Sequence, residues 1–226
     1  MTRGVEKVFR EAGAVLEGHF LLASGRHSPV YWEKFHILQH PPATQHLCRL
    51  IARHFRHQNI QVVAGPTLGG IILAFEVARH LGVRAIFAER EGEGEGRSFR
   101  KGRGRGLSPG ERVLIVDDVL TTGGSLRETI AAVEGQQGVV VGIGVMVDRS
   151  TVLPRRRVDF GVPLFSCHHP SEKEVVTYDP QECPLCRAGV PLTRRLRKPM
   201  KTFSKMRLHR PWGWARPSSA APSAWR

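Results

Sequence analysis

The first forty residues combine a helical pattern of apolar positions with a strand-like one. Apolar residues recur at helical spacing at Val5, Val8, Phe9, Ala12 and Leu16. A glycine at position 18 then predicts the end of a helix over residues 5–17. Residues 19–33 contain two apolar stretches separated by Ser-Gly and Ser-Pro turns, which predicts a hairpin or a pair of short strands. We therefore expect a small N-terminal lobe.

Strands and helices alternate along the middle of the chain. The run that follows Pro42 has helical spacing. After it we expect a strand over 62–64, a loop over 65–70, a helix over 71–81, a strand over 85–88, a strand over 113–116, a loop over 117–125, a helix over 126–133 and a strand over 139–147. Because these strands are apolar throughout and alternate with helices, they predict a parallel sheet buried on both faces. The predicted fold class is α/β, a doubly wound parallel sheet with a small N-terminal lobe, which we call the hood.

Residues 89–111 interrupt this alternation. They hold seven glycines interleaved with charged residues, a composition that no buried element tolerates. We expect a long mobile loop or a flexible hairpin here.

Composition and charge favour one catalytic core with a basic tail. The chain has 226 residues, of which 41% are hydrophobic, enough for one sizeable domain plus a small appendage. It has neither an apolar run of membrane-spanning length nor a secretory leader, which favours a soluble, cytoplasmic protein without membrane contact. The net charge is +14, and ten of these charges come from residues 194–226, which contain no acidic residue and no periodic pattern. We expect that tail to be disordered.

The chain thus divides into four expected parts. They are a hood segment at 1–40, a core at 41–165, a C-terminal extension that completes hood and core at 166–193, and the basic tail at 194–226.

The four cysteines do not suggest a disulfide framework, because they are few and the chain lacks a leader. For the Cys-Pro-Leu-Cys pair Cys183 and Cys186 we predict a turn closed by two reduced thiols. The alternative is a structural zinc site, with Cys167, His168 and His169 upstream as further ligands. A second cysteine pair with matching spacing is missing, which disfavours that alternative.

The segment VLIVDDVLTTGGS at 113–125 carries the most chemistry. Ligands of parallel sheets bind at the carboxyl ends of strands, which places Asp117 and Asp118 at the mouth of a crevice. Residues 121–125 offer backbone N–H groups and hydroxyls at a helix N-terminus, where a phosphate dianion is favoured. The two carboxylates can accept hydrogen bonds from vicinal ribose hydroxyls. The segment predicts a ribose-phosphate site; the alternative is a helix cap followed by an ordinary glycine turn.

A second glycine-rich loop, AGPTLGG at 64–70, also ends a strand and opens a helix. Its backbone amides suit a diphosphate group, and it lies one strand–helix unit before the stronger motif. A Walker sequence is absent, and no Rossmann fingerprint follows a strand, so those nucleotide-binding classes are not indicated.

The segment 113–125 resembles the diphosphoribosyl-binding signature of type I phosphoribosyltransferases. Residues 5–193 are similar to the orotate phosphoribosyltransferases, including LASGRHSPVYW at 22–32, which resembles their hood segment, and CPLCRAGVPL at 183–192. The resemblance implies transfer of the phosphoribosyl group of 5-phosphoribosyl 1-diphosphate to orotate, giving orotidine 5′-phosphate and diphosphate in pyrimidine biosynthesis. It also implies a homodimer and Mg²⁺ that is bound mainly through the substrate, with no direct protein ligand.

The resemblance assigns roles to individual residues. The implied catalytic residues are Asp117, Asp118 and Arg90. The implied contacts to phosphoribosyl diphosphate are Asp117, Asp118, Val119, Leu120, Thr121, Thr122, Gly123, Gly124, Ser125, Thr67, Gly69 and Arg90. The implied contacts to orotate are Tyr31, Trp32, Thr121 and Arg149, whose guanidinium would pair with the orotate carboxylate. The alternatives are packing of the lobe for Tyr31 and Trp32, and an ordinary surface position for Arg149.

Departures from the family pattern leave rival functions open. Lysines that are usual in the diphosphate loop and in the hood fall here on Gly69 and Ala23, and in the 89–111 loop only Arg90 matches clearly. Further cations that could reach the diphosphate after a change of register are Arg97, Arg100, Lys101, Arg103 and Arg105. One rival is a phosphoribosyltransferase for another nucleobase. The other is a non-catalytic regulatory or nucleic-acid-binding protein, for which the basic tail is the only positive sign.

Overall fold

A six-stranded sheet forms the centre of the computed structural model, which describes residues 2–22, 24–90, 96–99, 106–150 and 159–194. Its strand order is β5-β4-β3-β6-β7-β8. Pairing is parallel from β4 to β8, and β5 pairs antiparallel with β4 at the edge. The strands are β3 (Val62–Pro66), β4 (Arg84–Arg90), β5 (Arg97–Ser98), β6 (Arg112–Leu120), β7 (Val139–Asp148) and β8 (Leu164–His168).

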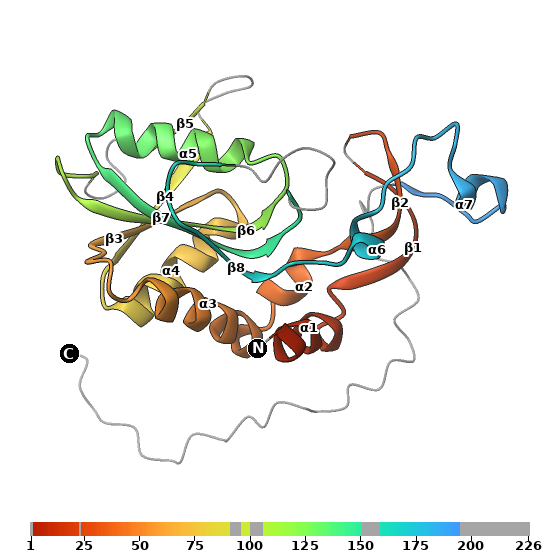
Figure 1. Cartoon of the computed structure of the whole chain (residues 1–226). Coiled ribbons are helices and arrows are strands. Elements are labelled where there is room, and N and C mark those ends of the chain that lie inside the picture. The colour runs from red at the N-terminus through yellow and green to blue at the C-terminus, as the bar shows by residue number, and fades with distance from the viewer. Residues whose placement is uncertain (1, 23, 91–95, 100–105, 151–158, 195–226) are drawn as a thin grey trace, which may run out of the picture. The chain divides into compact units, whose positions relative to one another are not determined.

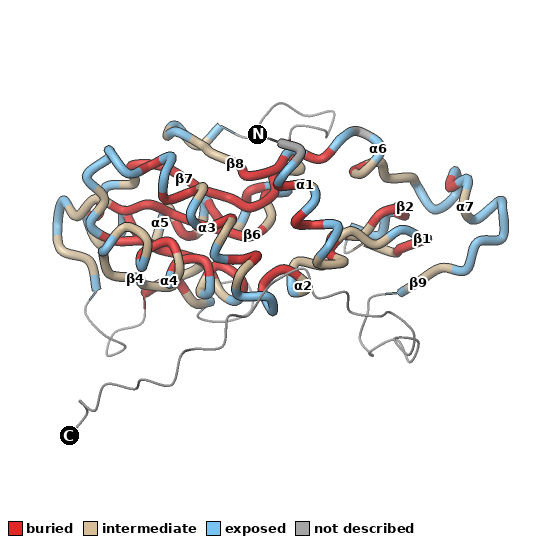
Figure 2. The backbone as a smooth tube through the Cα atoms, turned by 90° about the horizontal axis from the view of Figure 1, so that it is seen from below, coloured by how far each residue is buried: buried red, intermediate tan, exposed pale blue. Residues whose placement is uncertain are grey.

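Helices cover both faces of this sheet, as the apolar strands predict. Figure 1 shows α3 (Pro41–Phe55) and α4 (Gly69–Leu81) on one face and α5 (Gly124–Gly135) on the other. Because successive strand residues point to opposite faces, Leu114 packs in the cluster under α3 and α4, whereas Ile115 packs in the cluster under α5. The burial colouring of Figure 2 shows the sheet strands mainly as buried. The doubly wound α/β fold is confirmed.

The loop predicted over 117–125 is shorter in the structure. Two adjacent acids favour a strand end after Val116, yet β6 continues to Leu120 because β7 offers backbone partners alongside it. Asp117 thus pairs in register with Val145, and Leu120 with Asp148. The helices after both glycine-rich loops also begin earlier than predicted, at Gly69 and Gly124.

The hood contains a second sheet with the order β2-β1-β9. The predicted hairpin is confirmed as β1 (Val15–Leu21) and β2 (His27–Trp32), which pair antiparallel, while β9 (Thr193–Arg194) runs parallel to β1. The helix predicted over 5–17 is wrong in its second half. Helix α1 (Thr2–Glu11) stops early because Gly13 takes a left-handed conformation, with φ 65°, that reverses the chain into β1.

Three short helices complete the described elements: α2 (Lys34–Leu38), α6 (Glu172–Val175) and α7 (Pro184–Arg187). After α6 the chain runs beside the hood hairpin, where Tyr178 and His27 exchange two backbone hydrogen bonds of 2.9 and 2.8 Å. Of the 89–111 loop, the described part includes the short β4–β5 hairpin. Residues 91–95 and 100–105, and the tail from residue 195, lie outside the described residues. Among the described helices, none combines the length and apolar character needed to cross a membrane.

Candidate active site

The two predicted acids are buried near the carboxyl end of β6. Asp117 is 6% exposed and Asp118 is 3% exposed. The Ser125 hydroxyl donates to Asp117 Oδ2 at 2.9 Å, and the Asp118 amide donates to Asp117 Oδ1 at 2.8 Å. Burial, together with the adjacent charge of Asp118, raises the pKa of Asp117 to about 6. At neutral pH Asp117 is therefore mainly ionised and accepts hydrogen bonds from Ser125 in the first turn of α5 and from the Asp118 amide.

A lysine that the sequence pattern did not indicate contacts the second acid. Lys34 Nζ lies 2.8 Å from Asp118 Oδ2 and 3.1 Å from Asp118 Oδ1. Lys34 begins α2, directly after the hood strand β2, so this ion pair joins the hood to the core. The sequence offered only one sign of this contact, a lysine two residues after the hood segment 22–32, and such a lysine is usually an ordinary surface residue.

The turn after β6 leads straight into α5. Thr121 and Thr122 are exposed, and Ser125 is half-buried. The first turn of a helix leaves backbone N–H groups without helical partners, which suits an anion at this edge of the sheet. Val119 and Leu120 belong to the strand, and the Leu120 side chain lies in the apolar cluster under α5. The predicted segment therefore assembles at one place, with its last strand residue buried.

The second glycine-rich loop touches the acid pair. A Cβ at Gly69 would lie 1.8 Å from Asp118 Oδ2, so a side chain at position 69 would require the Asp118 carboxylate to move. The lysine that the family pattern places there is replaced by glycine, and the cation on Asp118 is Lys34. Thr67, in the same loop, accepts a hydrogen bond of 2.9 Å from Arg97.

Two arginines from the 89–111 loop approach this site in different ways. Arg97 contacts Thr67 and also lies 3.1 Å from Glu128 of α5, with its side chain only 7% exposed. Arg90, at the end of β4, pairs with the same Glu128 at 3.2 Å but is 53% exposed. Of the two, Arg97 is the cation that contacts the loop. The other expected cations, Arg100, Lys101, Arg103 and Arg105, lie outside the described residues, as does Ala23.

Arg149 follows β7 at the same edge of the sheet. Its backbone N–H donates to the Leu120 carbonyl at 2.9 Å. Its Nε is buried and has no hydrogen-bond partner among the described residues. Burial lowers the pKa of Arg149, whereas the nearby Tyr31 raises it. A half-buried guanidinium near Tyr31, with a buried Nε that has no partner within the described part of the chain, is suited to an anionic ligand.

The two hood aromatics differ in their surroundings. Tyr31 is half-buried, with its ring 5.6 Å from that of Phe20. Trp32 is only 7% exposed and packs against Phe9 and His168, with ring centroids 5.4 Å from each. Trp32 thus takes part in packing the lobe, whereas Tyr31 is the aromatic residue near Arg149.

The alternative zinc ligands proposed from the sequence are separated from the cysteine pair. The Cys167 thiol donates to the Leu47 carbonyl at 3.5 Å, and burial raises its pKa to about 12. His168 packs between aromatic rings, and His169 faces Asp148. The histidines near Cys183 and Cys186 are instead His19 and His27. No spacing rule indicates this set in the sequence, because its members come from opposite ends of the chain.

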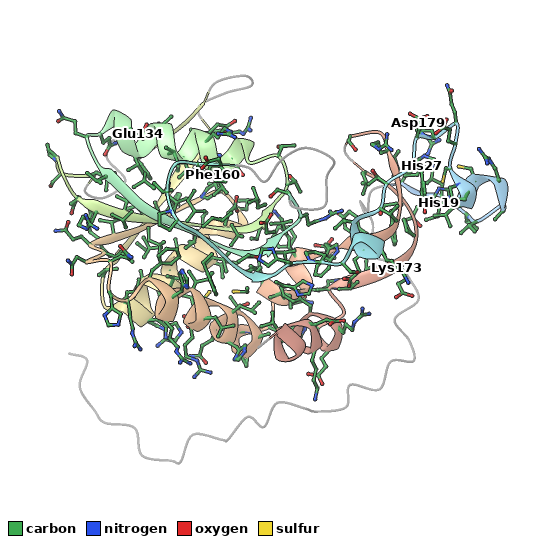
Figure 3. The ribbon with its side chains drawn as sticks, viewed as in Figure 1. His19, His27, Glu134, Phe160, Lys173 and Asp179 are labelled. Carbon is green, nitrogen blue, oxygen red and sulfur yellow. The ribbon has the colours of Figure 1, made fainter. Side chains whose placement is uncertain are left out.

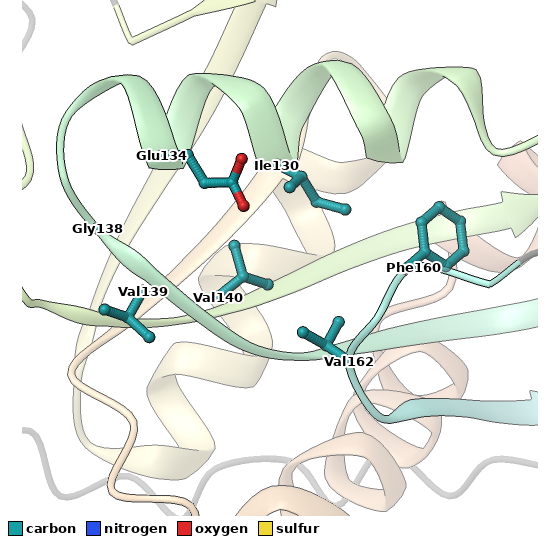
Figure 4. A pocket seen from close by; sticks show the side chains of 7 residues that line it. All are labelled: Ile130, Glu134, Gly138, Val139, Val140, Phe160 and Val162. Atoms are coloured by element: carbon teal, nitrogen blue, oxygen red, sulfur yellow. The ribbon is translucent and has the colours of Figure 1, made fainter.

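A separate hollow of about 230 Å³ lies between α5 and the start of β7 (Figure 4). Ile130, Val140 and Phe160 line it together with the Glu134 carboxylate. It adjoins the amino end of β7, whereas the acid pair lies toward the carboxyl end of β6. The hollow is therefore not part of the acid-pair site.

Comparison with known proteins shows the family of the chain. A family model described as a phosphoribosyl transferase domain matches residues 36–177. The chain is 47% identical over 195 residues to the orotate phosphoribosyltransferase of Pelotomaculum thermopropionicum, covering 86% of this chain and 97% of that relative. It is 44% identical over 188 residues to a Thermus thermophilus enzyme of the same name, covering 83% and 97%.

Solved structures show the same likeness. Orotate phosphoribosyltransferase from Aeropyrum pernix is 29% identical with a TM-score of 0.57, covering 72% of this chain and 93% of that one. The Mycobacterium tuberculosis enzyme in complex with inorganic phosphate is 26% identical with a TM-score of 0.60, covering 76% and 95%.

Proposed function

The chain belongs to the orotate phosphoribosyltransferase family, and on that premise we propose that it transfers the phosphoribosyl group of 5-phosphoribosyl 1-diphosphate to orotate. The products are orotidine 5′-phosphate and diphosphate, in pyrimidine biosynthesis. One observation supports orotate as the base. Arg149 interacts electrostatically with Tyr31, its backbone bonds to the strand that bears the acid pair, and its buried Nε has no partner among the residues that the structure describes.

The donor occupies the β6–α5 junction in this proposal. Residues 121–125 hold the 5-phosphate through backbone N–H groups and hydroxyls at the start of α5. Asp117 and Asp118 accept hydrogen bonds from the ribose hydroxyls. Lys34 pairs with Asp118 and so holds that carboxylate in place at the edge of the hood.

The leaving group faces the second loop. The bond from the anomeric carbon to the diphosphate oxygen breaks, and its electron pair leaves with the diphosphate. Backbone amides around Thr67, together with Arg97 and Arg90, stabilise that growing negative charge. Mg²⁺ bound through the hard oxygens of the substrate diphosphate would supply further positive charge at this point. The buried carboxylates of Asp117 and Asp118 are a hard-oxygen environment compatible with such an ion.

Orotate binds between the hood and the end of β7. Its carboxylate pairs with the Arg149 guanidinium, and Tyr31 contacts its ring. The ring nitrogen forms the new bond to the anomeric carbon and loses its proton. Since uracil lacks the carboxylate, this pairing gives the site a physical means of choosing orotate.

A homodimer is the proposed assembly, and an exposed apolar stripe at the start of α4 supports it. Leu68, Ile72 and Phe75 recur at helical spacing and are 70%, 42% and 67% exposed. Large apolar residues that are exposed together on one helix face are typical of an interface. Sedimentation equilibrium of the full chain should give twice the chain mass.

The proposal is tested by offering each base separately. Purified full-length protein is incubated with Mg²⁺, phosphoribosyl diphosphate and orotate, uracil, adenine or hypoxanthine, and nucleotide and diphosphate are measured. Turnover with orotate alone is expected. Turnover only with another base would establish the rival specificity, and no turnover with any base would overturn the enzymatic function and favour the non-catalytic rival.

A further inference from the structure

Four side chains that commonly bind metals meet in the hood. They are His19 of β1, His27 of β2, and Cys183 and Cys186 of the α7 turn, and their ligand atoms all lie within 4.8 Å of one another. Figure 3 shows His19 and His27 together where the C-terminal segment passes the hairpin. None of the four is among the residues assigned to phosphoribosyl transfer.

The distances within this cluster match a tetrahedral centre. Around a zinc ion, two thiolates and two imidazoles should be separated by roughly 3.3–3.8 Å, given the usual bond lengths. His19 Nε2 lies 3.0 Å from His27 Nδ1, 3.5 Å from Cys183 Sγ and 3.8 Å from Cys186 Sγ. His27 Nδ1 lies 3.3 Å from Cys186 Sγ. Of these four separations, only that of the two imidazole nitrogens is shorter than the range, by a few tenths of an ångström, and the remaining two pairs lie within 4.8 Å.

A second contact fixes the protonation of one ligand. His19 Nδ1 lies 2.8 Å from the Val190 carbonyl, which can only accept, so Nδ1 carries the proton. His19 Nε2 then presents a lone pair to the other three ligand atoms. A histidine that donates its second ring nitrogen to a backbone carbonyl is the usual support for a metal ligand. One lone pair serves only one good hydrogen bond, whereas a cation satisfies all four atoms together.

Burial around the cluster also points to a bound ion. His19, His27 and Cys183 are 2%, 5% and 0% exposed. Among residues 179–191, all of which the structure describes, Cys183 alone is buried. Neither apolar cluster of the protein includes a described residue of 176–194. This segment therefore lacks a hydrophobic anchor of its own, which is the situation in which small lobes use a structural metal.

We propose that His19, His27, Cys183 and Cys186 bind one structural Zn²⁺ that fastens residues 176–194 to the hood hairpin. Two thiolates and two imidazoles in tetrahedral positions are a ligand set suited to zinc. The two thiolate charges balance the dication, so the centre is neutral and compatible with burial. The site joins chain segments 164 residues apart, from His19 to Cys183. It thereby replaces the simple two-thiol turn expected from the sequence.

Zinc content of the full chain gives the first test. Protein purified without chelator, or treated with chelator and then given zinc, is dialysed and analysed by mass spectrometry of the metal. One zinc per chain is expected. Cys186→Ser is the main variant because Cys186 is exposed and its loss leaves no cavity; it should lower retention at least tenfold. Cys167→Ser changes a cysteine outside the cluster and should retain the metal.

Two further measurements distinguish tetrahedral zinc binding by these residues from a disulfide or a non-specific metal site. Cobalt added to the metal-free chain should give the intense visible bands of tetrahedral coordination and a thiolate charge-transfer band, both lost in Cys186→Ser. Zinc should raise the midpoint of thermal unfolding by on the order of 5–10 °C. The proposal is overturned if zinc-treated protein keeps far less than one ion per chain, if cobalt shows only octahedral bands, or if thiol titration finds a Cys183–Cys186 disulfide in freshly purified protein.

Discussion

The core sheet and the hood are stabilised by different interactions. In the core, β6 and β7 carry long runs of fully buried aliphatic residues, and apolar clusters fill both faces of the sheet. In the hood, the C-terminal segment is attached by backbone hydrogen bonds, by Arg26 contacts to Thr177 and by the histidine–cysteine cluster. Apolar packing thus holds the core sheet together, whereas the C-terminal segment of the hood depends on polar contacts and, in our proposal, on a bound zinc ion.

The largest effect should come from a cavity in the core. Leu114 is fully buried, and Leu114→Ala should lower the free energy of unfolding by about 3–5 kcal/mol, measured by urea denaturation. Because this loss concerns apolar packing alone, it should be the same with zinc bound and after chelation. A loss that changes with chelation would mean that core and hood are not energetically separate.

Asp118→Asn should separate chemistry from stability at the edge of the core. Turnover should fall by about 10²–10³, equivalent to roughly 3–4 kcal/mol, because the variant loses a charge that interacts with the ribose and with Lys34. Unfolding free energy should change far less, since Lys34 can turn to solvent. Steady-state kinetics and urea denaturation of the same preparation measure the two effects. If the activation and unfolding free energies changed equally, Asp118 would have a structural role.

The pH dependence of stability should report Asp117. Its pKa in the folded chain, about 6, lies above its ordinary value of 3.8, so the folded state binds this proton more tightly than the unfolded state. The stabilisation is complete below about pH 4 and is lost as the pH rises through about 6, by up to about 3 kcal/mol.

Asp117→Asn should therefore flatten the decline in unfolding free energy between about pH 4 and pH 6, measured by urea denaturation at several pH values. Asp179→Asn, at an exposed acid, is the matched control and should follow the wild-type curve. If the Asp117 variant also followed the wild-type curve, burial would not raise the pKa of the Asp117 carboxyl group.

The sequence predicted the parts of the molecule that follow from local pattern. Runs of buried aliphatic residues between glycine-rich loops indicated the doubly wound sheet, and the segment 113–125 indicated the strand and the following helix at which we propose that a phosphate binds. The sequence pattern mispredicted the ends of elements where contacts with another element determine them. The strand β6 extends past Asp117 because β7 lies beside it, and α1 ends at Glu11 because the left-handed Gly13 turns the chain into β1, which pairs with β2.

Site residues from distant segments were the hardest to predict. Lys34 reaches Asp118 across 84 positions, and no spacing rule connects them. His19 and His27 join the Cys183 turn only because the chain returns to the hairpin at Tyr178. Trp32, next to Tyr31 in sequence, faces the opposite side of its strand and packs inward, which alternation in a strand explains once the pairing is known.

In the proposed function the choice of base depends on Arg149, and the ratio of kcat/KM for orotate to that for uracil tests this assignment most directly. The two bases differ by the carboxylate that Arg149 is proposed to bind. Within the described part of the chain, Arg149 Nε has no hydrogen-bond partner, so Arg149→Gln breaks no hydrogen bond at that atom. A charge-assisted pair contributes about 1.5–3 kcal/mol, so we expect the ratio to fall by roughly 10- to 150-fold in this variant. An unchanged ratio, with both rates lowered equally, would contradict the assignment.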